Sequence, residues 1–313
     1  MSGIHEEMVA WLKKADALTI FAHVSPDGDT IGSSLALWHA LGQQAQLVCE
    51  DPIPEKYAFL PGAQAFLSPN AAQPRAYALA VDAADAGRLG TARSLFEAAA
   101  HTAVIDHHGT NPGYAQICRI EPDLGATGTL VREILNEGCW AASAEIALCL
   151  YVAISTDTGN FSFSSTRRRD MLAVADLVEK FDLAETTRRL FRMKRREHTL
   201  LLGEMLSGAR FCVDGRVAYG QVTGDMLSRV GAQYADIEGL IDSLINMEGV
   251  EVALLFSQRG DTKLSIRTLT MDAAAIAQRY GGGGHVRAAG ATLNLPLEEA
   301  VRRVVRDVER EME

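Results

Sequence analysis

Four short segments of this chain carry carboxylate and imidazole side chains, the groups that bind divalent cations and transfer protons. Oxygen and nitrogen ligands without cysteine favour hard or borderline ions such as Mn²⁺ or Mg²⁺ over structural zinc. Two such ions about 3.5 to 4 Å apart, bridged by one carboxylate, can clamp the attacking and leaving oxygens of a phosphate ester during hydrolysis. The candidate residues are His23, Asp27 and Asp29 in the first segment, Asp82 in the second, Asp106, His107 and His108 in the third, and Asp157 in the fourth.

The first segment places three candidate ligands in one loop, His23-Val-Ser-Pro-Asp27-Gly28-Asp29. We expect Gly28 to let the two carboxylates point in different directions, an arrangement that suits two ions better than one. A simpler interpretation is an Asp-Gly turn followed by a helix cap. This segment alone does not decide between the two.

The third segment contains adjacent histidines after an apolar run that ends at Ile105. Because neighbouring side chains diverge, His107 can bind a metal while His108 faces a substrate phosphate, and Asp106 can orient either ring through a hydrogen bond. Taken singly, each segment also fits a turn, a surface histidine pair or a helix cap, and Asp85 is such a cap candidate. Four segments with ligands at the same end of a β-like element are hard to explain independently.

The first half of the chain alternates β-rich runs with amphipathic helical stretches, which predicts βαβ units and an α/β fold with a doubly wound, mainly parallel sheet. Loops at the carboxyl ends of such strands line one crevice, so the four segments would meet there. The strand candidates are 18–22, 45–49, 76–81 and 102–105, with 146–154 either a strand or a helix. The helix candidates are 32–41, 87–100 and 127–136, the last with Thr127 as its cap.

The second half predicts a smaller α/β domain. Strand candidates are 217–222, 250–258 and 263–268, with helices near 237–245 and 297–311. Between the halves, residues 183–207 are helical and strongly charged, which indicates a linker helix with a solvated face. The predicted division is a catalytic domain at 1–182, the linker helix at 183–207 and a substrate-binding domain at 208–313.

In order and character, the four segments resemble the motifs of the DHH phosphoesterase family. The stretch from Tyr280 to Gly290 resembles the glycine-rich signature of that family's associated C-terminal domain, DHHA1, so the resemblance covers nearly the whole chain. It implies two divalent cations, with Mn²⁺ expected and Mg²⁺ or Co²⁺ as alternatives, and a contact of His108, supported by Asp106, with the scissile phosphate. The implied ligands are His23, Asp27 and Asp82 for one ion, and Asp29, Asp82, His107 and Asp157 for the other.

The glycine run also suggests phosphate binding by itself, because consecutive glycines let backbone N–H groups approach a phosphate closely. A flexible turn is the alternative interpretation. Strand alternation would put Ser265 and Arg267 on one face, and the resemblance implies that Arg267 grips a substrate phosphate or the terminal nucleotide in a cleft between the domains. The predicted substrate-binding residues are Arg267, Gly283, Gly284, His285 and Arg287.

Composition limits the class of protein. With 313 residues, 48% of them hydrophobic and 22% charged, the chain is long enough for two globular domains. Its net charge of −10 argues against a protein that coats long duplex DNA. Its apolar runs are shorter than the roughly 20 residues of a membrane span, and its N-terminus lacks the features of a secretory signal, so we expect a cytoplasmic protein that does not bind membranes. A homodimer is compatible with the sequence.

Within the family, the length and the two domains resemble the stand-alone group that degrades very short RNA as an oligoribonuclease and removes the 3′-phosphate of 3′-phosphoadenosine 5′-phosphate. The expected partners are therefore short RNA or nucleotide substrates. An alternative is a soluble phosphodiesterase for cyclic dinucleotides or their linear products. A non-catalytic sensor of nucleotides or metal is a third hypothesis, which the intact ligand set disfavours.

Overall fold

The structure is a computed structural model that describes residues 5–312, apart from the side chains of Gln43 and Arg259. The chain forms two compact units, Met1–Met193 and Lys194–Glu313. The boundary lies inside the segment that was expected to form a linker helix. Within residues 5–312, every helix is too short or too polar to span a bilayer.

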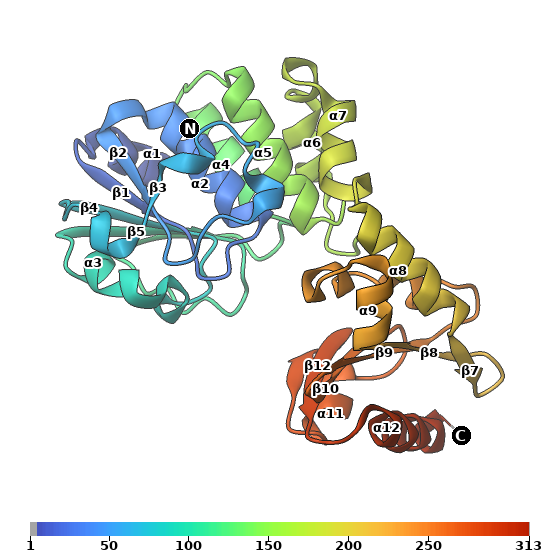
Figure 1. The fold of residues 1–313 in the computed structure, drawn as a ribbon. Coiled ribbons are helices and arrows are strands. Elements are labelled where there is room, and N and C mark those ends of the chain that lie inside the picture. Colours follow the sequence, from blue (N-terminus) through green and yellow to red (C-terminus); the bar gives the residue numbers. More distant parts are fainter. Residues whose placement is uncertain (1–4, 313) are drawn as a thin grey trace. The chain divides into compact units, whose positions relative to one another are not determined.

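The first unit is built on a parallel sheet (Figure 1). Its strand order is β3-β2-β1-β4-β5-β6. The order reverses between β1 and β4, and ligands of open α/β sheets bind in the crevice at the carboxyl ends of the strands beside such a reversal. The predicted α/β class with a parallel sheet is confirmed. The strands are β1 (Leu18–Phe21), β2 (Ala45–Val48), β3 (Phe66–Leu67), β4 (Tyr77–Val81), β5 (His101–Asp106) and β6 (Ile117–Ile120).

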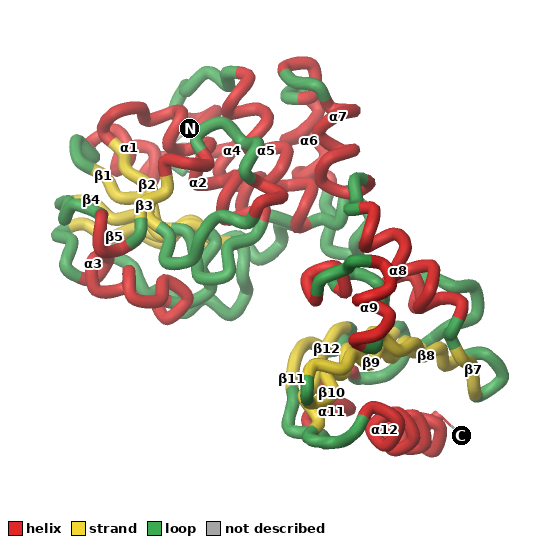
Figure 2. Tube along the Cα trace, viewed as in Figure 1, coloured by secondary structure: helices red, strands yellow, loops and turns green. Residues whose placement is uncertain are grey.

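Alternate residues of these strands face two separate hydrophobic cores. Leu79 and Val81 of β4 belong to the larger core, whereas Ala78 and Ala80 belong to the smaller one. Helices cover both faces of the strands, as Figure 2 shows. The larger core includes residues of α1 (Glu6–Lys14), α2 (Gly28–Leu41), α4 (Thr127–Glu137), α5 (Ala144–Asp157) and α6 (Arg168–Ala175), and the smaller includes residues of a 3₁₀ segment (Ala86–Ala92) and α3 (Arg93–Glu97).

One segment that the sequence left open is resolved by the structure, and another differs from the predicted element. Residues 146–154 are helical and lie within α5, which packs against α2 and α4. A helix buried on most sides is apolar on most sides, so its sequence lacks the periodicity that separates helix from strand. The helix expected at 87–100 is shorter, because a 3₁₀ segment kinks at Gly90 before α3 begins.

The second unit has a mixed sheet with the order β11-β12-β10-β9-β8-β7, in which β8 and β9 are parallel. In β9, Val252 and Leu254 lie on opposite sides from Ala253 and Leu255. Helices α11 (Ala273–Gln278) and α12 (Leu297–Met312) cover one face, and α8 (Arg196–Ser207), α9 (Gly224–Val230) and α10 (Asp242–Ile245) the other. The strands are β7 (Arg210–Cys212), β8 (Val217–Val222), β9 (Val252–Arg259), β10 (Asp261–Thr268), β11 (Gly283–His285) and β12 (Ala288–Leu293).

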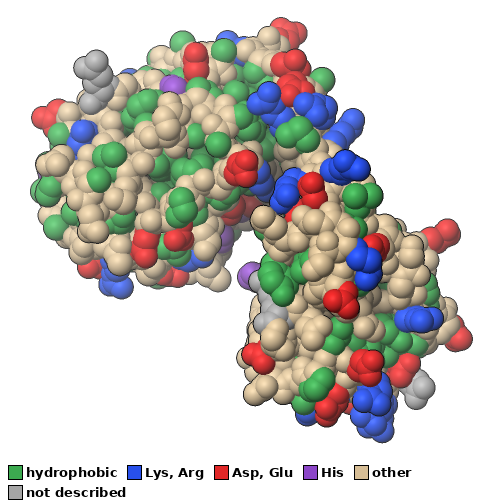
Figure 3. Space-filling model, viewed as in Figure 1, with side chains coloured by type: hydrophobic (Ala, Val, Ile, Leu, Met, Phe, Trp, Pro, Cys, Tyr) green, Lys and Arg blue, Asp and Glu red, His purple; other side chains and the backbone are tan. Residues whose placement is uncertain are grey.

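The charged stretch from residue 183 to 207 is not one continuous helix. It consists of α7 (Leu183–Thr187), a π-helical turn (Arg188–Arg192) and α8, and Leu201 and Met205 of α8 lie in the core of the second unit. Figure 3 shows Lys and Arg side chains among Asp and Glu side chains along this surface. Arg188 and Arg189 both pair with Glu185. These exposed ion pairs fit the predicted solvated face.

Candidate metal centre

The structure brings the predicted ligands together at the carboxyl edge of the first sheet. His23 follows β1, Asp82 follows β4, and the two histidines follow β5, whereas Asp27 and Asp29 lie at the start of α2. Asp157 comes from the end of α5, so the segment that the sequence left open as a strand or a helix is a helix. Three groups have ligand atoms within 4.8 Å of one another: His23, Asp27 and Asp82; Asp82, His107 and His108; and Asp29, His107 and Asp157.

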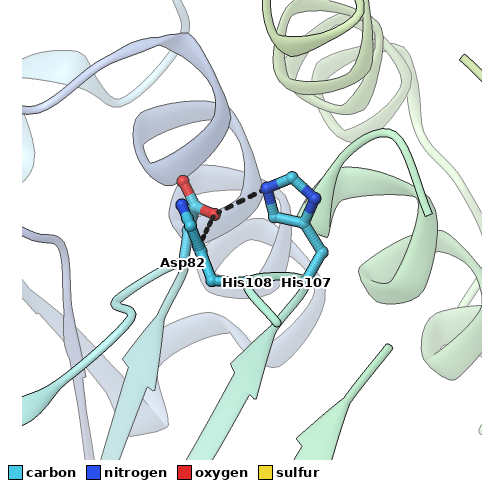
Figure 4. A group of neighbouring side chains, drawn as sticks. All are labelled: Asp82, His107 and His108. Atoms are coloured by element: carbon cyan, nitrogen blue, oxygen red, sulfur yellow. Dashed lines mark ion pairs between the residues drawn. The ribbon is translucent and has the colours of Figure 1, made fainter. Parts of the chain in front are cut away.

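Asp82 lies at the middle of this cluster. Its Oδ2 is 3.7 Å from Nε2 of His23, and its Oδ1 is 3.7 Å from Nε2 of His107 and from Nδ1 of His108. Figure 4 shows the ion pairs that link the carboxylate of Asp82 to both adjacent histidines. Asp82 is 2% exposed and has a φ of 59°. This left-handed conformation differs from the extended conformation of β4, which ends at Val81. Its two oxygens therefore face different imidazoles, the position of a bridging ligand.

His107 is oriented by the backbone. Its Nδ1 lies 3.1 Å from the carbonyl oxygen of Leu124, so Nδ1 carries the proton and Nε2 turns toward the cluster. Nε2 is 3.1 Å from Oδ2 of Asp157. Burial lowers the pKa of His107, but the hydrogen bond that the ring donates to Asp157 and the charge of Asp29 outweigh it and raise that pKa to about 9. The acidic surroundings thus favour a positive charge at this position.

Asp29 is fully buried at the N-terminus of α4. Its Oδ2 accepts from the backbone N–H of Thr127 at 2.6 Å, and its Oδ1 accepts from that of Gly128 at 2.9 Å. The hydroxyl of Ser33 also donates to Oδ1 at 2.9 Å. Burial and the nearby charge of Asp157 nevertheless hold the pKa of Asp29 well above its usual range. The fold therefore holds this carboxylate in place although burial disfavours its negative charge.

Thr127 has a different role from the predicted one. The cap residue of α4 is Ala126, and Thr127 is the first helical residue. Its hydroxyl donates to Oδ1 of Asp82 at 2.7 Å, so the start of α4 supports both Asp29 and Asp82. A capping interpretation from sequence missed this contact, because the partner is 45 residues away.

Asp27 serves both as a helix cap and as a candidate ligand. Its Oδ1 accepts from the backbone N–H of Asp29 and Thr30, and its Oδ2 lies 3.5 Å from Nε2 of His23. Gly28 also has a packing role, which the sequence did not indicate. A Cβ at Gly28 would lie 2.2 Å from Oγ1 of Thr156, so glycine is required there by the close approach of α5.

Asp106 orients His108. The Nδ1 of His108 donates to Oδ1 of Asp106 at 2.7 Å, and the side-chain amide of Asn111 donates to Oδ2 at the same distance. Burial raises the pKa of Asp106, but the hydrogen bonds from His108 and Asn111 outweigh it, and the net pKa is below the usual value. Asp106 is fully buried, whereas His108 is 42% exposed, so the far edge of its ring is open to a ligand. Sequence analysis missed Asn111.

The donor set fits divalent cations. Burial and repulsion from Asp29, Asp27 and Asp157 hold the pKa of Asp82 well above its usual range, and a bound cation would relieve that repulsion. Carboxylate oxygens and imidazole nitrogens, with no thiolate among them, suit a hard or borderline ion. The cluster can therefore bind divalent cations.

The predicted substrate-binding residues of the second unit lie in a hairpin and on a neighbouring strand. The glycine run is not a free loop, because Gly283 and Gly284 belong to β11, which pairs antiparallel with β12. A Cβ at Gly284 would lie 2.5 Å from the Cα of Ala289, so packing explains that glycine. Around Gly283 a Cβ would meet nothing within 4 Å, so packing among the described residues gives no reason for glycine there.

The remaining predicted residues of this unit are accessible. Ser265 and Arg267 of β10 line one hollow together with Lys263, as strand alternation predicts. Arg267 is 36% exposed, with its Nε 3.4 Å from Oδ1 of Asp242. His285 is exposed, and the Arg287 guanidinium donates to the carbonyl oxygen of Leu269. Their roles toward a substrate stay predictions.

Comparisons with known proteins agree with this geometry. A model of the DHH family, N-terminal domain, matches residues 17–154, and a model of the DHHA1 domain matches residues 214–313. A curated relative from Thermus thermophilus, named bifunctional oligoribonuclease and PAP phosphatase NrnA, is 35% identical over 302 residues, which cover 94% of this chain and 89% of the relative. The protein of the same name from Bacillus subtilis is 24% identical over 301 residues and 92% of each chain.

A solved structure supports the fold. An exopolyphosphatase-related protein from Bacteroides fragilis matches 98% of this chain and 95% of its own with a TM-score of 0.88 at 24% identity.

Proposed function

The chain belongs to the DHH family, and we propose that it is a metal-dependent phosphoesterase that hydrolyses short oligoribonucleotides and 3′-phosphoadenosine 5′-phosphate. The names of the relatives from Thermus thermophilus and Bacillus subtilis support this choice of substrates. The observation that carries the proposal is the position of Asp82, whose two carboxylate oxygens face His23 and His107 from the centre of the cluster.

The proposal includes two divalent cations, Mn²⁺ in preference to Mg²⁺ or Co²⁺. When bound, such a pair polarises a phosphate oxygen and lowers the pKa of a bound water. The chain itself supplies deprotonated ligands at fixed places. Helices α2 and α4 position Asp29, and the end of β4 positions Asp82. The residues that would hold the ions are His23, Asp27 and Asp82 for one, and Asp29, Asp82, His107 and Asp157 for the other.

His108 is the proposed contact to the scissile phosphate. The carboxylate of Asp106 accepts from its Nδ1 and leaves Nε2 facing the open side of the site, so when Nε2 is protonated it can donate to a phosphate oxygen or to the leaving oxygen. Asn111 holds the second oxygen of Asp106 and keeps the carboxylate in place. In this pair the exposed His108 can contact the substrate, and the buried Asp106 orients it.

The second unit would bind the rest of the substrate. Arg267, His285 and Arg287 supply charge and hydrogen-bond donors, and Gly283 and Gly284 supply an accessible backbone. The described residues leave open space around Gly283. We therefore infer that glycine occupies this position because a ligand approaches the backbone closely. A cytoplasmic location and a homodimer stay predictions.

A substrate panel tests the proposal. Purified protein is incubated with Mn²⁺ and, separately, a labelled diribonucleotide, 3′-phosphoadenosine 5′-phosphate and cyclic di-AMP. We expect turnover of the first two and release of inorganic phosphate from the second. Preference for cyclic di-AMP would reject the proposed substrates in favour of a cyclic-dinucleotide phosphodiesterase, and no hydrolysis of any of the three would reject the enzyme.

A further inference from the structure

Arg88 lies against the metal centre and has no role in the sites described above. Its Nη2 is 2.9 Å from Nδ1 of His23, and the other ring nitrogen of His23 lies 3.5 Å from Asp27 and 3.7 Å from Asp82. His23 is 2% exposed, while Arg88 is half-buried. The guanidinium is therefore one side chain away from the clustered carboxylates.

The backbone of Arg88 is tied to the loop that carries His23. Its carbonyl oxygen accepts from the backbone N–H of Val24 at 2.8 Å, and its own N–H donates to the side chain and the carbonyl of Asp85. Asp85 also caps the 3₁₀ segment that contains Arg88. The position of Arg88 beside the cluster is thus set by the main chain and not by a chance side-chain conformer.

The contact between Arg88 and His23 cannot persist when His23 binds a cation. Nδ1 of His23 lies 2.8 Å from the carbonyl oxygen of Val24 and 2.9 Å from Arg88, so one nitrogen faces an acceptor and a donor. A guanidinium only donates. If Nε2 of His23 binds a metal, Nδ1 keeps the proton and donates to Val24, so Arg88 has to direct its N–H groups elsewhere.

No carboxylate is within ion-pair distance of Arg88 in the part of the chain that the structure describes. Other arginines of the first unit do have such partners, for example Arg93 with Glu97 and Arg169 with Glu133. A guanidinium has five donors in a planar fork that matches two oxygens of a phosphate. The edge of a metal centre that takes phosphate esters is where such an anion would arrive.

We propose that Arg88 is a substrate-binding residue whose guanidinium leaves His23 and hydrogen-bonds to a phosphate oxygen of the substrate beside the ion held by His23, Asp27 and Asp82. This inference rests on the proposed function and deepens it. The competing role is a positioning one, in which Arg88 only orients the ring of His23. The two roles differ in whether substitution changes affinity for phosphate or affinity for metal.

The test compares Arg88→Gln with the unsubstituted protein in two titrations by calorimetry, Mn²⁺ alone and then a nucleotide into the Mn²⁺-loaded protein. The nucleotide is given as the analogue of 3′-phosphoadenosine 5′-phosphate whose 3′-phosphate is replaced by a non-hydrolysable phosphonate, with adenosine 5′-monophosphate, which lacks that group, as the comparison ligand. We expect an unchanged Mn²⁺ affinity and a loss of affinity for the phosphonate nucleotide of roughly 10- to 100-fold, the range for one hydrogen-bonded charge. Arg88→Lys, which keeps the charge without the fork, should fall between the two proteins. Arg93→Gln is the matched control on the same segment and should behave as the unsubstituted protein.

Each contrary result has a definite meaning. Unchanged nucleotide affinity in Arg88→Gln, or a loss of Mn²⁺ affinity in the same variant, overturns the inference and leaves the proposed function standing. Failure of the unsubstituted protein to bind the nucleotide and to hydrolyse the substrate panel overturns both. Equal melting temperatures of the four proteins establish that the variants are folded.

Discussion

The metal centre of the first unit and the glycine hairpin of the second are built in opposite ways. Asp29, Asp82 and Asp106 are at most 2% exposed, and each is held by hydrogen bonds: Asp29 and Asp82 by the start of α4, which is distant in sequence, and Asp106 by the nearby Asn111. Gly283, Gly284 and His285 are exposed on an edge strand. The fold alone therefore positions the proposed metal ligands. The proposed substrate-binding residues, in contrast, would form most of their hydrogen bonds with the bound substrate.

The largest effect is expected from the centre of the buried region. Asp82→Asn removes the negative charge that two groups of ligands share, and loss of a stabilisation of several kcal/mol lowers kcat by about 10³-fold or more. The measurement is turnover of a labelled diribonucleotide with Mn²⁺. Asp123→Asn, at an exposed position of the same unit, is the control and should keep full activity. Near-normal kcat in Asp82→Asn would show that the shared carboxylate is not needed.

A smaller effect is expected from the support of that carboxylate. Thr127→Val removes the hydroxyl that donates to Asp82 but keeps the shape of the side chain, and loss of a hydrogen bond to a metal ligand costs about 10- to 100-fold in metal affinity or activity. Thr127→Ser keeps the hydroxyl and should restore most of the affinity. Mn²⁺ titration of both variants checks this, and equal affinity for both would mean that the hydroxyl does not support the site.

Glycine substitutions compare the two regions by stability. A Cβ at Gly32 would lie 2.4 Å from the carbonyl oxygen of Cys149, so Gly32→Ala should lower the free energy of unfolding by about 1 to 3 kcal/mol, the usual cost of overpacking. Gly283→Ala meets open space and should leave stability unchanged while raising KM for the substrate. Urea unfolding and steady-state kinetics measure both. A destabilised Gly283→Ala would mean that packing, not a ligand, requires glycine in the hairpin.

The last expected effect is a dependence of stability on pH. In metal-free protein the pKa of His107, about 9, lies above its unfolded value near 6.5, so the stabilisation from its protonation is complete below pH 6.5 and is lost as pH rises through 9. One proton changes stability by at most about 1.4 kcal/mol per pH unit. Urea unfolding in the presence of a chelator at pH 6.5 and 9 should show this decrease, and His107→Gln should reduce it. A slope that is equal in both proteins would assign the effect to other groups.

The sequence predicted more of the buried region than of the exposed one. Strand ends could be located because apolar runs stop at His23, Asp82 and Asp106, and parallel strands bring their carboxyl ends to one edge. The family resemblance from these motifs is confirmed. What could not be predicted depends on tertiary pairing: the hydroxyl of Thr127 reaching Asp82, and the strand character of the glycine run beside Ala289.

The sequence also gave no sign of a residue's role where the local pattern was ordinary and the contact was with a residue distant in sequence. Arg88 follows an aspartate cap by three residues, which is ordinary for the start of a helical turn, and only the structure places its guanidinium at His23. Before Asp157 the sequence left a strand or a helix open, because the mostly apolar α5 has no helical periodicity to decide between them. In both cases the local pattern was compatible with several environments.

The number of Mn²⁺ ions bound per chain tests the central claim most directly. Titration of the metal-free protein with Mn²⁺, followed by calorimetry and by the paramagnetic resonance signal of the free ion, should give two ions for the unsubstituted chain and fewer in Asp82→Asn. The same stoichiometry in both proteins, or no binding to the unsubstituted chain, would contradict a metal centre organised around Asp82.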